Sequence, residues 1–320
     1  MTSANWGEAL AVGLKAFIKD EFDKYEPIYP KIFEVFSTEK AYEEYVNSTS
    51  IGYMLKRASG SPVQYEDPLQ GYKTRLTPQI FSKGMQAPKE LFDDDQYNII
   101  NGQARKLVDR SKVTSDRFAF NPFRGAFTTT VTSYGDGLPL CSTVHTRIDG
   151  GATQSNASST GIPLNETNLE TGALALQEVL DDKGQLITVG ETGIINLMVP
   201  LALRKTALIV TKSVLRPEGA NNDVNVYQAF GDYGVIVNPW ISGRVLAVDG
   251  DIAGSNTAWF LIASSYNGLK FVNREAFNLD HDYVNDTRTL RVQAHMRNIA
   301  GWIDWRGVWG SKGDNAAYSS

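Results

Sequence analysis

Histidine is the side chain most often used for proton transfer and metal binding near neutral pH, and this chain of 320 residues contains three. They are His145, His281 and His295, and no two of them have the spacing of a metal-binding pair. His281 lies within Asp280-His281-Asp282, which either a metal site or a solvated loop would explain. We favour the loop, and the sequence predicts no metal ion.

Three further motifs contain residue types that can do chemistry. The segment from Gly307 to Gly313 is similar to a phosphate-binding loop, but it lacks the Gly-Lys-Ser/Thr order and no helix follows it. Cys141 has no activating base nearby in the sequence, so we expect a small buried residue. Asp93-Asp94-Asp95 could bind a divalent cation, but negative charge at the start of a helix explains the same residues. The sequence therefore predicts no catalytic site and no cofactor.

The composition is that of an ordinary globular protein and limits the classes of function. Hydrophobic residues make up 42% of the chain and charged residues 21%. The net charge of −5 argues against a protein whose main surface grips nucleic acid, and the single cysteine excludes a disulfide framework. No apolar run approaches membrane-spanning length, and the N-terminus lacks the features of a signal peptide. We therefore expect synthesis in a cytoplasm and no membrane contact.

Two segments of different character follow each other between Pro62 and Lys112. The stretch from Pro62 to Thr77 is polar and reads as two extended arms around a loop, and no cluster of large apolar residues is expected between Ile51 and Thr77. A two-stranded hairpin without a buried face is marginally stable in water, so we expect this one to pack on a neighbouring subunit. From Pro88 to about Lys112, acidic residues come early, basic residues come late and apolar residues share one face. This order predicts a long helix.

The remaining elements are predicted from periodicity and from turn residues. A helix is expected over residues 5–25 with an apolar face, a short one from Ser37 to about Tyr45, one from the N-cap Asn165 to Gly184, and one after Pro200. Strands are expected over residues 128–132, 138–145, 194–199, 233–237, 245–248, 259–263, 269–273, 290–297 and 301–310. The pair Asn267-Gly268 predicts a hairpin between two of these strands. The fold class is α+β.

Four passages in consistent order resemble a known family. They are Pro62 to Tyr72; Leu91 to Tyr97; Asp136 to Leu140, followed by His145, Gly151 and Asn156; and Asp304 to Gly313. Together they resemble the phage major capsid proteins of the HK97-like fold, in particular the branch described as Mu-type major head subunits. The likeness spans about residues 30 to 313.

The resemblance implies a division of the chain into four parts. Residues 1–50 would form an N-terminal arm and residues 51–84 an extended β-hairpin loop. Residues 85–160 and 275–320 would form a peripheral domain with a long spine helix, and residues 161–274 a mixed α/β axial domain facing fivefold and sixfold axes. The arm and the loop would contain the inter-subunit residues, namely Trp6, Phe17, Tyr65, Glu66, Asp67, Tyr72, Lys73 and Arg75.

The function implied by the resemblance is structural and not enzymatic. The protein would self-assemble, as pentamers and hexamers, into an icosahedral shell that encloses packaged double-stranded DNA without sequence-specific contacts. Further expected partners are a portal protein and, where they exist, separate scaffolding and decoration proteins. The expected location is the virion capsid, after assembly in the host bacterial cytoplasm. Two roles are open for Arg291, Arg297 and Arg306, contact with DNA or pairing on the sheet surface and between subunits, and we favour the second.

Two other functions remain open at this point. The first is an encapsulin-like nanocompartment, which would have the same fold and would enclose cargo enzymes in place of a genome. The second is a soluble α+β enzyme or binding module, which would be a small monodisperse particle with a substrate pocket. Particle size separates this second alternative from both kinds of shell.

Overall fold

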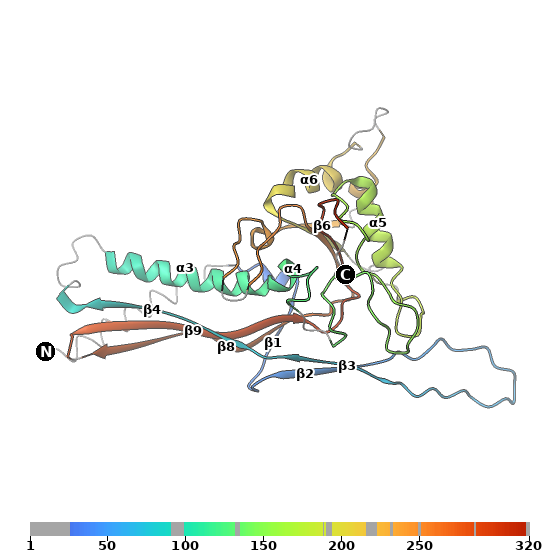
Figure 1. Cartoon of the computed structure of the whole chain (residues 1–320), viewed down its shortest axis with the longest axis horizontal. Helices are drawn as coiled ribbons and strands as arrows, with labels where there is room; N and C mark the ends of the chain where they lie inside the picture. Colours follow the sequence, from blue (N-terminus) through green and yellow to red (C-terminus); the bar gives the residue numbers. More distant parts are fainter. Residues whose placement is uncertain are drawn as a thin grey trace.

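The structure is a computed structural model, and it describes residues 26–90, 99–131, 135–187, 189, 194–215, 223–230, 233–248, 251–284 and 286–317. The molecule is elongated (Figure 1). Long strands and one long helix form an arm on the left, a rounder part with shorter helices lies to the upper right, and a hairpin with a long loop projects to the right.

The elongated part on the left of Figure 1 is a four-stranded sheet covered by one helix. The strand order is β1 (Glu34–Ser37), β8 (Leu269–Val284), β9 (Thr289–Trp302) and β4 (Gln79–Pro88), and β1 runs parallel to β8 whereas the other pairs are antiparallel. The helix is α3 (Ile99–Ala119). It buries Leu107 and Val108 against apolar side chains of β8 and β9, and burying each such side chain contributes about 1.5–3 kcal/mol.

The alternation in β9 follows the sequence prediction. Leu290, Val292, Ala294 and Met296 are buried, whereas Arg291 and Gln293 between them are exposed. Because successive side chains of a strand point to opposite faces, this pattern places one face of β9 toward α3. The predicted half-buried strand is confirmed.

The helical region begins near the predicted residue and extends further than predicted. Pro88 is the last residue of β4 and pairs with Thr289, and Lys89 and Glu90 directly after it are helical. At the other end α3 continues past Lys112 to Ala119. The three aspartates Asp93, Asp94 and Asp95 lie outside the described residues.

The rounder part is built on a second four-stranded sheet. Its order is β10 (Val308–Ser311), β7 (Trp259–Ala263), β5 (Ile195–Val199) and β6 (Tyr233–Val237), with β5 and β6 parallel. The predicted strands 194–199, 233–237 and 259–263 are confirmed. The elements around this sheet are α5 (Glu166–Gln177), η2 (Leu201–Leu203), α6 (Arg204–Lys212), α7 (Val226–Phe230) and η3 (Pro239–Ile241).

Helix α5 begins where the sequence predicts and ends earlier. The side-chain oxygen of Asn165 accepts a hydrogen bond from the N–H of Asn168 at 2.8 Å, which confirms the N-cap. Leu169, Ala173 and Leu176 are buried on one face. The helix ends at Gln177, and Gly184 lies in a later turn with a φ of +74°.

Aromatic side chains join the two sheets. The ring of Phe33, near the start of the described chain, lies 5.8 Å from Phe120 and 5.9 Å from Phe123 of α4 (Asn121–Arg124). Phe123 in turn packs at 5.2 Å against Phe260 of β7. The 3₁₀ helix η1 (Tyr29–Lys31) leads into Ile32 and Phe33, which are both buried in this core.

The projecting hairpin consists of β2 (Glu43–Ser48) and β3 (Gln70–Leu76), which pair antiparallel. Residues 37–45 run from the end of β1 through an irregular connection to the start of β2, so the predicted short helix is wrong. Their strand partners, β8 and β3, are distant in the sequence. Pairing with these partners overrides the local helix-start signal at Ser37.

Three strand predictions are also wrong. Residues 128–131 form turns, and residues 138–145 contain one isolated bridge, from His145 to Gln154. Residues 245–248 are irregular. The turn at Asp136-Gly137 is confirmed, because Gly137 has a φ of +74° and Asp136 Oδ1 accepts a hydrogen bond from Leu138 N at 3.0 Å.

Asn267-Gly268 does not form the predicted hairpin. The strands on either side of it, β7 and β8, belong to different sheets. Asn267 donates a hydrogen bond to the carbonyl of Ile32 at 2.7 Å, and a Cβ at position 268 would lie 2.2 Å from the carbonyl oxygen of Asp304. The glycine is needed for close packing of two chain segments.

Candidate assembly surface

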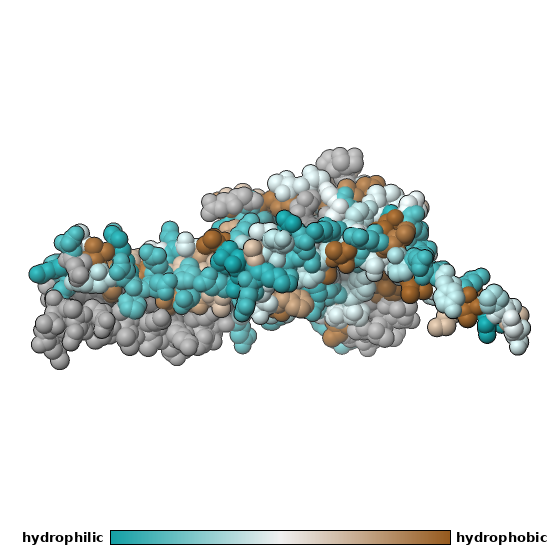
Figure 2. Space-filling model, turned by 90° about the horizontal axis from the view of Figure 1, so that it is seen from below, coloured by the Kyte–Doolittle hydropathy of each residue, from teal (hydrophilic) through white to brown (hydrophobic). Residues whose placement is uncertain are grey.

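The loop between β2 and β3 exposes apolar side chains that a monomer does not cover. Met54 is 102% exposed and Tyr65 is 91% exposed. The other large apolar side chains exposed there are Ile51, Tyr53, Leu55, Val63 and Leu69. In Figure 2 the loop is the narrow projection at one end of the molecule, with brown apolar atoms among the teal ones. An exposed group of this kind marks an interaction surface.

The two predicted basic residues of the loop support its root. Across the β2–β3 pair, Glu44 accepts from Lys73 Nζ at 2.7 Å and from Arg75 Nε at 2.7 Å. Hydrogen bonds from Lys73 and then Arg75 lower the pKa of Glu44 below its usual value. The Arg75 guanidinium also lies 4.2 Å from the ring centroid of Tyr42. Lys73 and Arg75 thus hold the hairpin together within the subunit.

The other predicted site residues are divided between the loop and the body. Tyr72 OH lies 2.7 Å from Thr146 Oγ1, so this tyrosine contacts the body. The Glu66 carboxylate accepts from Gly52 N at 2.9 Å and pairs with Lys183 at 3.3 Å, and these contacts lower its pKa. Tyr65 and Asp67 are exposed. Trp6 and Phe17 lie outside the described residues.

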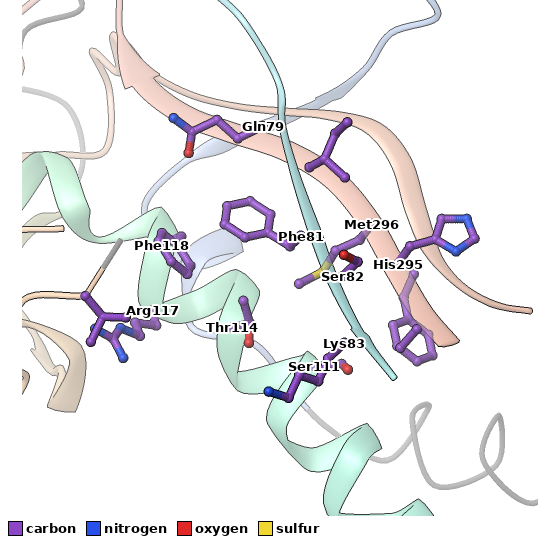
Figure 3. Close-up of a pocket in the computed structure, with 14 residues that line it drawn as sticks. Gln79, Phe81, Ser82, Lys83, Ser111, Thr114, Arg117, Phe118, His295 and Met296 are labelled. Carbon is purple, nitrogen blue, oxygen red and sulfur yellow. The ribbon is translucent and has the colours of Figure 1, made fainter. Parts of the chain in front are cut away.

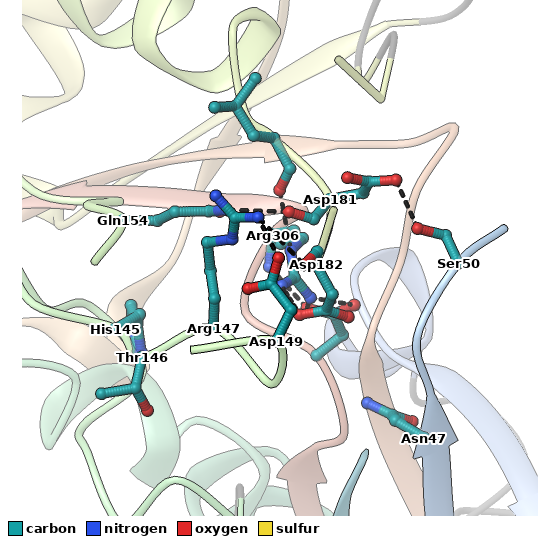
Figure 4. A network of polar contacts seen from close by, with 12 residues as sticks. Asn47, Ser50, His145, Thr146, Arg147, Asp149, Gln154, Asp181, Asp182 and Arg306 are labelled. Carbon is teal, nitrogen blue, oxygen red and sulfur yellow. Dashed lines mark hydrogen bonds and ion pairs between the residues drawn. The ribbon is translucent and has the colours of Figure 1, made fainter. Parts of the chain in front are cut away.

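A buried polar network lies below the root of the loop (Figure 4). Arg306 Nη2 contacts Asp182 at 2.7 Å, Arg306 Nη1 contacts Asp304 at 3.3 Å, and Arg306 Nε donates to the carbonyl of Leu180 at 3.1 Å. The side chain of Arg306 is 5% exposed. The sequence interpretation that placed this arginine on a sheet surface or between subunits is wrong, because its carboxylate partners lie within the same subunit.

His145 lies in a second buried pair. Its Nδ1 is 2.8 Å from Asp136 Oδ2, and its ring stacks on Trp305 at 4.2 Å with an interplanar angle of 5°. The predicted burial of Cys141 is confirmed, and this burial raises the pKa of its thiol, which disfavours a nucleophilic thiolate. The described residues contain no group of three or more His, Cys, Asp or Glu side chains placed to hold a metal ion.

A groove of about 600 Å³ separates α3 from β4 and β9 (Figure 3). Phe81 of β4 and Phe118 of α3 both line it and pack against each other, with ring centroids 4.5 Å apart. Met296 of β9 and Thr114 of α3 also line it. The groove is open, and its lining mixes aromatic, aliphatic and polar side chains.

Comparison with known families distinguishes a capsid protein from a soluble enzyme or binding module. A family model described as phage capsid protein matches residues 71–311. The chain belongs to the phage capsid protein family. It is a structural protein of a phage head and not an enzyme. A comparison with curated protein sequences finds no match.

Solved structures show that this capsid protein has the HK97-like α+β capsid fold. It is similar to the capsid of the cyanophage P-SCSP1u (TM-score 0.57, 10% identity, covering 91% of this chain and 89% of that one). It is also similar to the capsid of a native GTA particle (TM-score 0.55, 14% identity, covering 88% of this chain and 87% of that one). A third similar structure is a virus-like particle from Pyrococcus furiosus (TM-score 0.52, 10% identity, covering 93% of this chain and 97% of that one). Identities this low show a shared fold alone.

No helix in the described part of the capsid protein is both long and apolar enough to span a membrane.

Sequence reasoning located the loop and missed the polar network beneath it. Asp182 and Arg306 are separated by 124 positions, and nothing in the local sequence of either one signals the pair.

Proposed function

We propose that the protein is the major head subunit of an icosahedral capsid that encloses double-stranded DNA, and that subunits are joined through the extended loop. The observation that carries the proposal is the exposure of apolar side chains along this loop, above all Met54 and Tyr65. Their burial against a neighbour would remove apolar surface from water at about 25 cal/mol per Å². Many such symmetric contacts sum to a stable shell.

We further propose the four-part division set out from the sequence. Residues 1–50 form the N-terminal arm, 51–84 the extended loop, 85–160 with 275–320 the peripheral part, and 161–274 the axial part. Residues 79–84 belong to β4, which pairs with β9, so we assign them to the sheet of the peripheral part. Strand β10 pairs with β7, so we assign residues 308–311 to the sheet of the axial part. Trp6, Phe17, Tyr65, Glu66, Asp67, Tyr72, Lys73 and Arg75 remain the proposed inter-subunit residues, with the last three acting chiefly at the root of the loop.

The proposed partners are copies of the chain as pentamers and hexamers, a portal, separate scaffolding or decoration proteins, and DNA bound without sequence preference. A net charge of −5 supports this last point, because an acidic shell does not hold the genome tightly. Assembly in the host bacterial cytoplasm and descent from the Mu-type branch are part of the same proposal.

The experiment compares two loop variants with the wild type by light scattering and electron microscopy. Met54→Ser/Leu55→Ser removes exposed apolar side chains, whereas Lys56→Ser/Arg57→Ser changes polar neighbours in the same loop. We expect shells from the wild type and the polar variant and none from the apolar variant. Normal assembly of the apolar variant would contradict the proposed role of the loop. Failure of the wild type to assemble with any scaffold or portal would contradict the shell function itself.

An encapsulin-like compartment is the second candidate, because the similarity to the virus-like particle from Pyrococcus furiosus concerns the same fold. The match to the phage capsid family favours a phage head. Particles purified from the native host separate the two, since a phage head contains DNA and a nanocompartment contains a cargo protein.

A further inference from the structure

The extended loop leaves the body beside a turn formed by residues 181–187, and both of its arms contact that turn. On the outgoing arm, Ser50 Oγ hydrogen-bonds to Asp181 Oδ2, and Tyr53 OH donates to the carbonyl of Leu186 at 3.2 Å. On the returning arm, the Glu66 carboxylate pairs with Lys183 Nζ at 3.3 Å. One short segment therefore holds both arms, and Figure 4 shows Ser50 directed at Asp181.

The 181–187 turn is ordered by its own hydrogen bonds. Asp181 Oδ1 accepts from Lys183 N and from Gln185 N, both at 2.8 Å, so one carboxylate both closes the turn and contacts the loop. Gly184 has a φ of +74°, a conformation that favours glycine. Burial alone would raise the pKa of Asp181, but hydrogen bonds from Ser50, Gln185 and Lys183 outweigh it and lower the pKa.

Arg306 fixes the 181–187 turn to the body of the subunit. The buried guanidinium contacts Asp182 at 2.7 Å and the carbonyl of Leu180 at 3.1 Å, on either side of Asp181. Arg306 is itself held by Asp304, whose carboxylate also accepts from Tyr266 OH at 2.7 Å. A continuous set of contacts thus runs from the connection between β9 and β10 to the root of the loop.

We propose that the 181–187 turn is a positioning element for shell assembly, in which Asp181, Ser50 and Lys183 hold the extended loop in the direction that a neighbouring subunit requires. This inference rests on the proposed function of the loop. A loop already held in its bound direction loses less conformational entropy when it docks. The loop's contacts with the turn are made by Ser50, Tyr53 and Glu66, while the apolar side chains of Met54, Leu55 and Val63 stay exposed. The turn therefore sets direction without covering the surface that binds.

The first test uses a matched pair of variants at one position. Ser50→Thr keeps the hydroxyl that hydrogen-bonds to Asp181. Ser50→Val introduces a side chain of nearly the same shape as threonine but without the hydroxyl. We expect the critical concentration for assembly, measured by light scattering and sedimentation, to rise about tenfold for Ser50→Val and to stay near wild type for Ser50→Thr. Urea unfolding midpoints of unassembled subunits should agree between the two variants. Equal critical concentrations would overturn the inference.

The second test locks the contact. The variant Ser50→Cys/Asp181→Cys places two thiols where the side chains now meet, and the buried Cys141 does not compete for either. Both redox forms lack the Asp181 carboxylate that closes the turn, so they differ only in the covalent link. We expect the oxidised form to assemble at lower concentration than the reduced form, because the disulfide holds the loop against the turn. Equal or better assembly of the reduced form would overturn the inference.

The two tests separate failure of this inference from failure of the proposed function. If the wild type forms shells and the Ser50 variants form them equally well, the turn has no positioning role and the proposed function stands. If the wild type forms no shells with any scaffold or portal, the proposed function fails first.

Discussion

The carboxylate of Asp116 on α3 accepts a hydrogen bond from the backbone N–H of Ile28 at 2.9 Å, across 88 positions of sequence. The same carboxylate accepts from Tyr29 N at 3.0 Å. Asp116 is fully buried, and burial followed by the nearby Asp116 charge raises the pKa of the Tyr29 hydroxyl. This residue of the long helix is thus the point where the first described residues attach to the body.

Asp116→Ala should destabilise the unassembled subunit by about 1–3 kcal/mol, because it removes the acceptor of two backbone N–H groups. Urea unfolding measures the change. The matched control is Asp109→Ala, an exposed position of the same helix, for which we expect about 0.5 kcal/mol or less. Equal effects at the two positions would show that Asp116 does not anchor the chain.

Two glycine-to-alanine changes in helices should have opposite signs. A Cβ at Gly172 of α5 would lie 2.8 Å from the Trp309 ring and 3.0 Å from Leu261 Cδ1, so Gly172→Ala should cost about 1–3 kcal/mol through overpacking. A Cβ at Gly102 of α3 would meet nothing within 4 Å, so Gly102→Ala should add about 0.5–1 kcal/mol through helix propensity. Thermal unfolding of both variants measures the difference, and stabilisation by Gly172→Ala would contradict the packing of α5 on β10.

Buried and exposed ion pairs of this chain should differ strongly in their effect on stability. Arg306→Met leaves Asp182 and Asp304 without their cation and should cost about 3–5 kcal/mol. Lys73→Met breaks the partly exposed pair with Glu44 and should cost about 0–1 kcal/mol. Denaturant titrations compare the two. Similar small losses would show that the Arg306 network does not fix the body beneath the loop.

Cys141 should be unreactive in the folded subunit. Burial raises the pKa of its thiol, so the reactive thiolate is absent near pH 8 and the sulfur is also inaccessible. We expect a coloured thiol reagent to label the native protein at the rate of unfolding and to label the urea-unfolded protein within the mixing time. Rapid labelling of the native subunit would show that the core around Cys141 is open.

The elements that sequence reasoning found are those with a local signal. Buried strands such as Trp259–Ala263, the alternation from Leu290 to Met296 and the N-cap at Asn165 depend on neighbouring residues, so they could be predicted. The helix predicted from Ser37 to about Tyr45 was wrong because the chain there joins β1 to β2, and these strands pair with β8 and β3, which a local signal cannot reveal.

The assembly surface could also be predicted only in part from the sequence. The lack of large apolar clusters expected between Ile51 and Thr77 indicated a projecting hairpin, but its two arms do not both lie within Pro62–Thr77, because β2 pairs with β3. The exposed side chains of Met54 and Leu55 lie within the stretch that was expected to lack such a group. The contact between Ser50 and Asp181 joins residues 131 positions apart, and each side chain alone is typical of a solvated loop. Only the folded chain brings them together.

The claim that the extended loop contacts a neighbouring subunit is tested most directly by crosslinking from one of its exposed side chains. A photo-crosslinking phenylalanine analogue replaces Tyr65, and shells are assembled from an equal mixture of variant subunits and isotope-labelled wild-type subunits. Mass spectrometry of the crosslinked peptides then shows which chain supplied each partner. We predict abundant crosslinks from variant loops to labelled peptides of another subunit. Shells whose crosslinks from position 65 all lie within the variant chain would contradict the claim.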